Sequence, residues 1–308
     1  MRIIIAGGSG LIGSELAKEL LLLGQEVVIL SRNPQKVTNL PKGAQVVGWD
    51  GKTSQGWGHL VEGAGAIVNL VGENIAGEKF FPARWTAARK KSILQSRLDA
   101  GEALVEAIRA AKIKPGVLVQ ASAIGYYGPL KDEIVDENRA AGSDFMANTC
   151  VAWEGSTADV ESFDVRRIVI RSGVVLSAQG GAFTRLLLPF KLFAGGPLGN
   201  GKQYLSWIHM VDQVGAIRFL IENSVAQGVY NLTTPQPVTN AEFARIVGRV
   251  LHRPSFIPVP AFIFRLMFGE VATVVVDGQR VVPGRLLQLG YPFKFVHAEE
   301  AIRDVLRK

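Results

Sequence analysis

The feature that most constrains this chain is its beginning, where an apolar run, a glycine-rich turn and a helical pattern follow one another directly. Residues 2–6 are short, apolar and mostly β-branched, which is typical of a strand buried on both faces. Leucines then recur at helical spacing over residues 11–23, and the pattern closes at Gly24. When a strand, a glycine turn and a helix follow one another in this order, a G-x-G-x-x-G match in the turn indicates dinucleotide binding.

Two glycine patterns overlap in this turn. Gly8, Gly10 and Gly13 satisfy G-x-G-x-x-G, and Gly7 with the last two satisfies G-x-x-G-x-x-G. One glycine makes the tight turn, one lets a pyrophosphate approach the backbone, and one lets the helix pack close to the strand. The positive end of the helix dipole then faces the anion. The alternative interpretation of the glycines is a structural turn that binds no ligand. We predict that cofactor phosphates lie along Gly7, Gly8, Ser9, Gly10, Leu11, Ile12 and Gly13.

The end of the second predicted strand, residues 26–30, selects between the two dinucleotides. An NAD-binding protein places a carboxylate near this point to hold the ribose 2′-hydroxyl. Here the strand runs into Ser31 and Arg32, a hydroxyl and a guanidinium that suit a 2′-phosphate. The sequence therefore predicts NADP(H), with a solvated charge at a strand end as the alternative for Arg32.

Further candidates follow the later strands, because ligands bind at the carboxyl edge of an open α/β sheet. Asp50 follows a third predicted strand at 44–48 and could bond an adenine amino group or cap its own loop. Gly72 follows a fourth strand at 66–70 and permits close approach of the cofactor. Ser122 is the first residue after a fifth strand at 117–121.

Composition limits the class of protein. The 308 residues are 48% hydrophobic and 20% charged, which fits a globular protein rather than a disordered one. The net charge of +7 is spread along the chain, which suits anionic small ligands better than a nucleic acid. The single Cys150 excludes an internal disulfide, and the four scattered histidines predict no metal site. Since a predicted strand begins at residue 2 and no apolar run reaches membrane-spanning length, we expect a cytoplasmic protein without signal peptide or transmembrane segment.

The pattern of elements predicts an α/β fold, a Rossmann-type doubly wound parallel sheet with a small C-terminal α/β lobe. We expect an NADP-binding domain over residues 1–253, with substrate-lobe insertions from about 177, and the small lobe over 254–308. The other predicted elements are a helix at 82–111, a strand at 165–171, a helix at 183–193, a glycine-rich lid-like loop at 195–201, a helix opening at 207, a strand at 229–232, a helix capped by Thr239 and ending at Leu251, and helices at 261–268 and 298–306.

Together these motifs resemble the extended, atypical short-chain dehydrogenase/reductase superfamily, and within it an epimerase-like subfamily with its own C-terminal domain, some of whose members are called cell-division inhibitors. The matching segments are 7–13, 31–32, 69–75, 84–85, 96–97, 171–176, 195–199, 207–209, 240–244 and 279–283. The resemblance implies NADP(H) along the glycine turn with Arg32 on the 2′-phosphate. It also implies cofactor contacts from Leu70, Val71 and Arg97, and from Val175 at the nicotinamide end.

The catalytic residues of that superfamily are only partly present. Its members use a Ser or Thr after strand five and a Y-x-x-x-K pair, in which lysine and the nicotinamide charge lower the tyrosine pKa. Ser122 matches the first, but Cys150 and Glu154 occupy the positions of the pair. Tyr126 or Tyr127 could reach the site from the loop after Ser122, although without a lysine the pKa of the phenol would stay at its ordinary value of about 10. Ser122 and Tyr127 are the candidate catalytic residues, with turn capping and burial under the loop as their respective alternatives.

Two functions follow. The first is an NADP(H)-binding oxidoreductase or epimerase-like enzyme that acts on a small-molecule substrate. The second is a catalytically weak or inactive NADP(H)-dependent regulator or scaffold, for example in cell division, since the tyrosine–lysine pair is missing. A homodimer and a protein partner both remain open, and attachment to a membrane surface through residues 256–268 is a further alternative.

Overall fold

The computed structural model describes residues 1–37, 42–77 and 81–307. Its centre is a seven-stranded sheet in which all neighbours are parallel. From one edge to the other the strands are β3 (Gln45–Gly48), β2 (Glu26–Ser31), β1 (Arg2–Ala6), β4 (Ala66–Asn69), β5 (Val117–Ala123), β7 (Arg166–Ser172) and β11 (Gly228–Leu232). The strand order reverses between β1 and β4, so the predicted Rossmann-type fold is confirmed and its ligand-binding switch point lies there.

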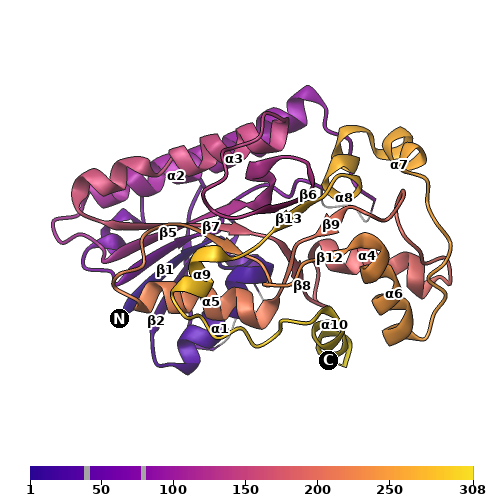
Figure 1. Cartoon of the computed structure of the whole chain (residues 1–308). Helices are drawn as coiled ribbons and strands as arrows, with labels where there is room; N and C mark the ends of the chain where they lie inside the picture. The colour runs from indigo at the N-terminus through magenta and orange to yellow at the C-terminus, as the bar shows by residue number, and fades with distance from the viewer. Residues whose placement is uncertain (38–41, 78–80, 308) are drawn as a thin grey trace.

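Helices cover both faces of this sheet (Figure 1). On one face lie α1 (Leu11–Leu22) and α5 (Met210–Glu222), where Ile3, Leu16 and Ile217 share one buried core. On the other lie α2 (Ala87–Ala110) and α3 (Phe145–Gly155), and Leu104 of α2 packs in a second core with Ile4. Because side chains alternate along a strand, consecutive β1 residues such as Ile3 and Ile4 enter opposite cores.

Segments after β5 add smaller units beside the sheet. Three strand pairs form there: β6 (Leu130–Val135) with β13 (Gln279–Val281), β8 (Val174–Leu176) with β10 (Trp207–His209), and β9 (Tyr204–Leu205) with β12 (Val238–Thr239). The remaining helices are α4 (Gly181–Lys191), α6 (Asn240–Leu251), α7 (Ala261–Phe268), α8 (Thr273–Val276), α9 (Gly284–Gln288) and α10 (Ala298–Arg307), and the 3₁₀ turns are Pro34–Lys36, Gly58–Val61, Ile124–Tyr127, Ala158–Phe163 and Gly269–Ala272. A third core joins α4, α6 and α10 through Phe183, Phe243 and Ile302.

Most predicted elements are confirmed, and two helices start later than predicted. The helix predicted at 82–111 begins at Ala87, because the Thr86 side chain accepts the Arg89 backbone N–H and so caps it. The helix predicted to open at 207 begins at Met210, since Trp207–His209 pair with β8 as a strand. Thr239 and Glu242 form a full capping box at the start of α6, as the sequence indicates.

The strand pair β6–β13 was not predicted, and it ties the end of the chain back to the segment after β5. The proposed boundary at 253/254 between a large domain and a small lobe stays a prediction. Among the described residues, no helix is long and apolar enough to cross a membrane.

Candidate functional site

The glycine turn between β1 and α1 has the close contacts that its spacing predicts. Gly7 has a φ of +79°, and a Cβ there would lie 3.0 Å from the backbone carbonyl of Leu70. A Cβ on Gly13 would lie 2.5 Å from the Gly7 oxygen, closer than any side chain tolerates. Glycine is therefore required at Gly7 by conformation and at Gly13 by the packing of α1 against the turn.

The turn leaves the amino end of α1 open to a ligand. Gly10 is the N-cap residue, no side chain caps the helix, and its first turn carries no acidic residue. The first helical hydrogen bond runs from the Ser14 N–H to the Gly10 oxygen at 2.9 Å. The N–H groups of Leu11, Ile12 and Gly13 precede it and face outward with the positive end of the helix dipole. This arrangement suits a phosphate or diphosphate.

The first cavity, of about 600 Å³, lies beyond the carboxyl ends of β1, β2 and β4. Three cationic side chains line it: Arg32 after β2, Lys52 in the loop after β3, and Lys91 on α2. In the described part of the chain, neither Arg32 nor Lys91 has an ion-pair partner, and Lys52 lies 3.9 Å from Asp99. The other lining residues are Gly7, Ser9, Gly10, Leu30, Ser31, Trp49, Asp50, Gly51, Leu70, Val71, Gly72, Glu73, Ala88, Ser92, Gln95, Ser96 and Asp99.

Asp50 shapes one wall of the first cavity. One carboxylate oxygen accepts the N–H groups of Lys52 and Thr53, each at 2.8 Å, and the other accepts the Thr53 hydroxyl at 2.9 Å. The N–H bonds from Lys52 and Thr53 lower the pKa of Asp50. Asp50 thus caps its own loop, one of its two predicted roles. Since it also lines the cavity, contact with adenine stays a prediction.

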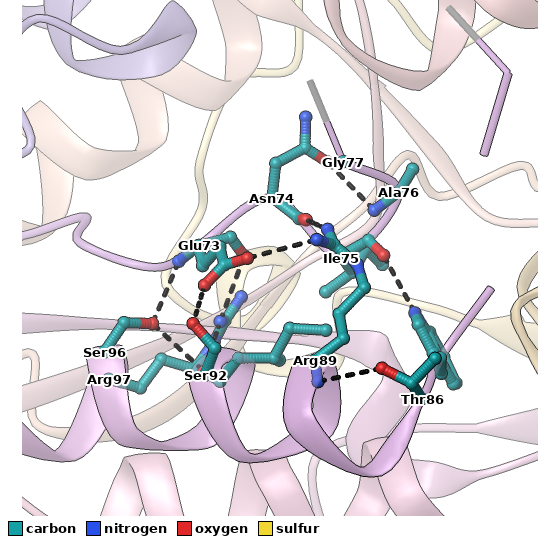
Figure 2. Close-up of polar contacts among 12 residues, drawn as sticks. Glu73, Asn74, Ile75, Ala76, Gly77, Thr86, Arg89, Ser92, Ser96 and Arg97 are labelled. Carbon is teal, nitrogen blue, oxygen red and sulfur yellow. Dashed lines mark hydrogen bonds and ion pairs between the residues drawn. The ribbon is translucent and has the colours of Figure 1, made fainter. Parts of the chain in front are cut away.

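A loop over residues 71–77 lines both the first cavity and a second one. Helix α2 holds this loop in place (Figure 2). Glu73 is the centre of the contacts, because its carboxylate binds Arg89 at 3.2 Å and accepts the Ser92 hydroxyl, while its N–H donates to Ser96 at 3.1 Å. Trp85 adds a bond from its ring N–H to the Ile75 carbonyl at 2.8 Å. The loop that would face the middle of a bound cofactor is therefore rigidly attached.

Arg97 lies behind this loop, although the resemblance implies that it contacts the cofactor. Its guanidinium donates to the carbonyls of Glu73 and Ile93 and stacks 4.6 Å from the Trp153 ring. It also packs under Gly72, where a Cβ would lie 2.8 Å from the guanidinium carbon. Burial lowers the pKa of Arg97, and its Nε has no hydrogen-bond partner among the described residues. Arg97 thus supports the loop from below, and its contact with a cofactor stays a prediction.

The second cavity, of about 580 Å³, continues from the first, and both are lined by Gly7, Gly10, Leu70 and Gly72. It extends past Val175 toward α8 and α3. The remaining lining residues are Leu11, Ile12, Gly13, Asn74, Ile75, Ala123, Ile124, Gly125, Gly128, Pro129, Asp144, Met146, Ser172, Gly173, Val174, Gly181, Ala182, Thr273, Val274, Asp277 and Gln279. The two cavities form one groove along the switch point of the sheet, so the predicted positions of Leu70, Val71 and Val175 lie in it.

The two candidate catalytic hydroxyls lie in a buried polar network beside the second cavity, not in its lining. Ser122 is 4% exposed and donates to Glu154 Oε1 at 2.7 Å. Arg171 binds both oxygens of Glu154 at 2.8 Å and donates to the Tyr127 hydroxyl at 3.1 Å. The Tyr127 hydroxyl donates in turn to Asn231 at 2.7 Å. The catalytic roles of Ser122 and Tyr127 stay predictions, and their hydroxyls are bonded inside the protein.

The electrostatics of this network differ from those of a proton-transfer site. Burial raises the pKa of Tyr127 to about 12, against the smaller opposing effect of Arg171. Burial and the neighbouring Glu154 raise the pKa of the Cys150 thiol to about 11. Both groups therefore hold their protons more tightly than usual. Cys150 is a buried packing residue.

Several residues that line the groove escaped the sequence interpretation. They are Lys52, Glu73, Lys91, Asp144, Asp277 and Gln279. Lys91 and Glu73 carried a signal, since both belong to segments at the carboxyl edge of β4 that the sequence places near the cofactor. Gln279 belongs to the 279–283 segment that carries the resemblance, but nothing in the sequence places it in the groove. Asp277 carried no signal, and both residues reach the groove beside the pair that β13 forms with β6.

Comparisons with known proteins show the family and the fold. A family model described as "NAD dependent epimerase/dehydratase family" matches residues 3–233, and a domain of unknown function (DUF1731) matches 259–305. The chain is 38% identical to the chloroplastic SDR39U1 homolog of Arabidopsis thaliana, covering 100% of this chain and 87% of that one. It is also 38% identical to SDR39U1 of Bos taurus, covering 99% and 100%. A crystal structure of human SDR39U1 (isoform 2) with NADPH superposes with a TM-score of 0.87 at 34% identity over the full length of both chains.

Proposed function

The chain belongs to the NAD-dependent epimerase/dehydratase family, and we propose that it is an NADP(H)-dependent oxidoreductase or epimerase-like enzyme with an atypical active site. The observation that carries the proposal is the form of the groove. Its first cavity joins the uncapped amino end of α1 to three cationic side chains, and its second cavity offers room for a substrate. The relative crystallised with NADPH supports the choice of cofactor.

The residues present fit NADP(H) along the whole groove. The N–H groups of Leu11, Ile12 and Gly13 would take the diphosphate, and glycine at Gly7 and Gly13 leaves the space it needs. Arg32, with Lys52 beside it, would hold the 2′-phosphate through charge-assisted hydrogen bonds. No carboxylate follows β2 to favour a free 2′-hydroxyl.

The second cavity would hold the nicotinamide and the substrate. When bound, the cofactor supplies hydride chemistry. The chain would orient both molecules between apolar side chains, with Val174 and Val175 from β8, Ile124 from the turn after β5 and Met146 from α3. A carbonyl oxygen that becomes a hydroxyl needs one proton. Solvent is the source that fits best, because the hydroxyls of Ser122 and Tyr127 are bonded within the protein.

The experiment that tests this function is a turnover screen with the full-length protein. Absorbance of NADPH at its near-ultraviolet band is followed with a panel of aldehydes, ketones and sugar nucleotides. NADPH-dependent turnover of one class is the expected result. NADPH binding without turnover of any compound would contradict an enzymatic function.

The second candidate is an NADP(H)-dependent regulator or scaffold, and the buried network favours it. Glu154 occupies the position of the superfamily lysine and is fully engaged by Arg171 and Ser122. In this case the protein would bind NADPH tightly and change its affinity for a protein partner. Co-purification from a lysate with and without NADPH distinguishes the regulatory function from the enzymatic one. An unchanged set of partners would contradict regulation by the cofactor.

A further inference from the structure

The second cavity has a lining that selects among substrate classes. Most of its side chains are apolar, among them Leu11, Ile12, Ile124, Met146, Val174 and Val274. Cavities lined in this way gain binding free energy from apolar ligand surface, with a few polar groups to fix orientation. The first cavity, in the same groove, is lined by charged side chains of both signs, namely Arg32, Lys52, Lys91, Asp50, Glu73 and Asp99.

The charged groups of the second cavity are acidic. Among the described lining residues, the ionisable ones are Asp144 and Asp277. Asp277 is neutralised by Arg265, which donates to both of its oxygens at 2.7 and 2.9 Å. Asp144 accepts the Ala147 N–H at 2.7 Å as the cap of α3 and leaves the lining with a net negative charge. Leu11, Ile12 and Gly13, whose N–H groups would take the cofactor diphosphate, also line this cavity and would be covered by the bound cofactor. A second diphosphate, brought by the substrate, would lie among the remaining apolar side chains and in a lining of like charge, which disfavours it.

Among the described residues, no cation lines this cavity, and cations that bond residues near its lining are engaged with other groups. Arg185 donates to the Gly77 carbonyl at 2.7 Å, and Arg89 binds Glu73 and the Asn74 carbonyl. The polar lining groups are also engaged, since the Gln279 amide donates to the Ile124 carbonyl at 2.9 Å and the Ser172 hydroxyl accepts from Gln213. The cavity therefore offers few hydrogen bonds, which fits a ligand with one polar group.

The opening of the cavity is apolar as well. Val274 on α8 both lines the cavity and is 43% exposed. The neighbouring α7 exposes Phe262 and Leu266, at 68% and 72%.

We infer that the second cavity takes an uncharged, largely apolar carbonyl compound or the corresponding alcohol, and that it disfavours sugar nucleotides. This inference rests on the proposed NADP(H)-dependent function. In the reducing direction a hydride passes from NADPH to the carbonyl carbon and a proton from water to the oxygen, which gives the alcohol and NADP⁺.

The test compares matched neutral and anionic probes on the full-length protein saturated with NADPH. Octan-1-ol, octanoate and UDP-glucose are titrated by calorimetry, after NADPH binding itself has been measured. Octan-1-ol is expected to bind at least about tenfold more tightly than either anion. Binding of octanoate or UDP-glucose as tightly as octan-1-ol, or binding of none of the three, overturns the inference. Absence of NADPH binding contradicts the proposed function itself, so the two failures are distinguishable.

Two variants sharpen the test. Asp277→Asn removes the carboxylate that neutralises Arg265 and should raise octanoate affinity about three- to tenfold with little change for octan-1-ol. Val274→Lys places a cation in the lining of the cavity and should also raise octanoate affinity. Asp159→Asn is the matched control, because it frees the exposed Arg109 away from the groove and should change neither probe. Unchanged octanoate affinity in both variants would overturn the charge argument.

Discussion

The two ends of the groove use their charged residues in opposite ways. At the β1–β2 end, Arg32 and Lys91 face the first cavity and lack ion-pair partners in the described part of the chain. At the β5–β7 end, Glu154 and Arg171 form an ion pair with each other and hydrogen bonds to the hydroxyls of Ser122 and Tyr127. One end keeps charge available for a ligand, whereas the other uses charge to connect its own elements.

This difference shows how a fold can keep its cofactor and lose the usual proton-transfer pair. Glu154 lies one helical turn after Cys150, where the superfamily has lysine after tyrosine. Its carboxylate joins α3 to β5 through Ser122 and to β7 through Arg171. Removing one partner of a buried ion pair strongly destabilises a protein. We therefore expect substitutions at the β5–β7 end of the groove to lower stability, and substitutions at the β1–β2 end to weaken cofactor binding.

Loss of the buried carboxylate should have the largest effect. Glu154→Gln leaves Arg171 without its charged partner and should lower the free energy of unfolding by about 3–5 kcal/mol, measured by urea denaturation. Glu161→Gln removes the exposed partner of Arg167 and should cost less than about 1 kcal/mol. Equal, small effects of both variants would contradict a structural role for the network.

The second largest effect is expected when a side chain is added to the glycine turn. Gly13→Ala places a Cβ 2.5 Å from the Gly7 oxygen and should lower stability by about 1–3 kcal/mol and weaken NADPH binding. Gly155→Ala is the control, because a Cβ there meets nothing within 4 Å in the last turn of α3 and should not destabilise. Thermal unfolding and calorimetry measure both changes. Normal NADPH binding by Gly13→Ala would show that the turn does not hold the diphosphate.

The cations of the first cavity should affect binding rather than stability. Arg32→Ala should raise the Kd for NADPH about ten- to hundredfold, through loss of a charge-assisted bond, and leave the Kd for NADH nearly unchanged. Arg109→Ala, an exposed cation on α2 away from the groove, should change neither constant. An equal loss for both dinucleotides in Arg32→Ala would remove Arg32 from the 2′-phosphate site.

The smallest effect concerns Tyr127 at alkaline pH. Its folded pKa of about 12 lies above the ordinary value of 10.0, so the folded state holds the phenol proton more tightly. That stabilisation is complete below about pH 10 and is lost as the pH rises toward 12. Between pH 10 and 11 the wild type should lose about 1 kcal/mol more than Tyr127→Phe in urea denaturation. Identical pH dependence in the two proteins would contradict the buried, protonated phenol.

Local sequence patterns predicted the sheet and the cofactor turn because both depend on neighbours in sequence. The apolar run at 2–6, the glycine spacing and the Thr239 cap each specify a structure within a few residues. The order of the sheet then follows from right-handed connections between parallel strands. Arg32 was found in the same way, since it directly follows β2.

Contacts between distant segments could not be predicted in this way. Nothing in residues 145–155 indicates that Glu154 meets Arg171, which lies 17 residues later on β7. Likewise, Lys52 and Asp277 reach the groove through a loop after β3 and through the β6–β13 pair. The sequence revealed the missing tyrosine and lysine, but only the structure revealed the ion pair that takes their place.

The central claim is that the groove keeps a working, phosphate-selective cofactor end. Calorimetric titration of the wild-type protein with NADPH and with NADH tests it most directly. We predict binding of NADPH at least about tenfold tighter than NADH, as expected from the charge-assisted bonds to a 2′-phosphate. Equal affinity for the two, a preference for NADH, or no binding of either would contradict the account.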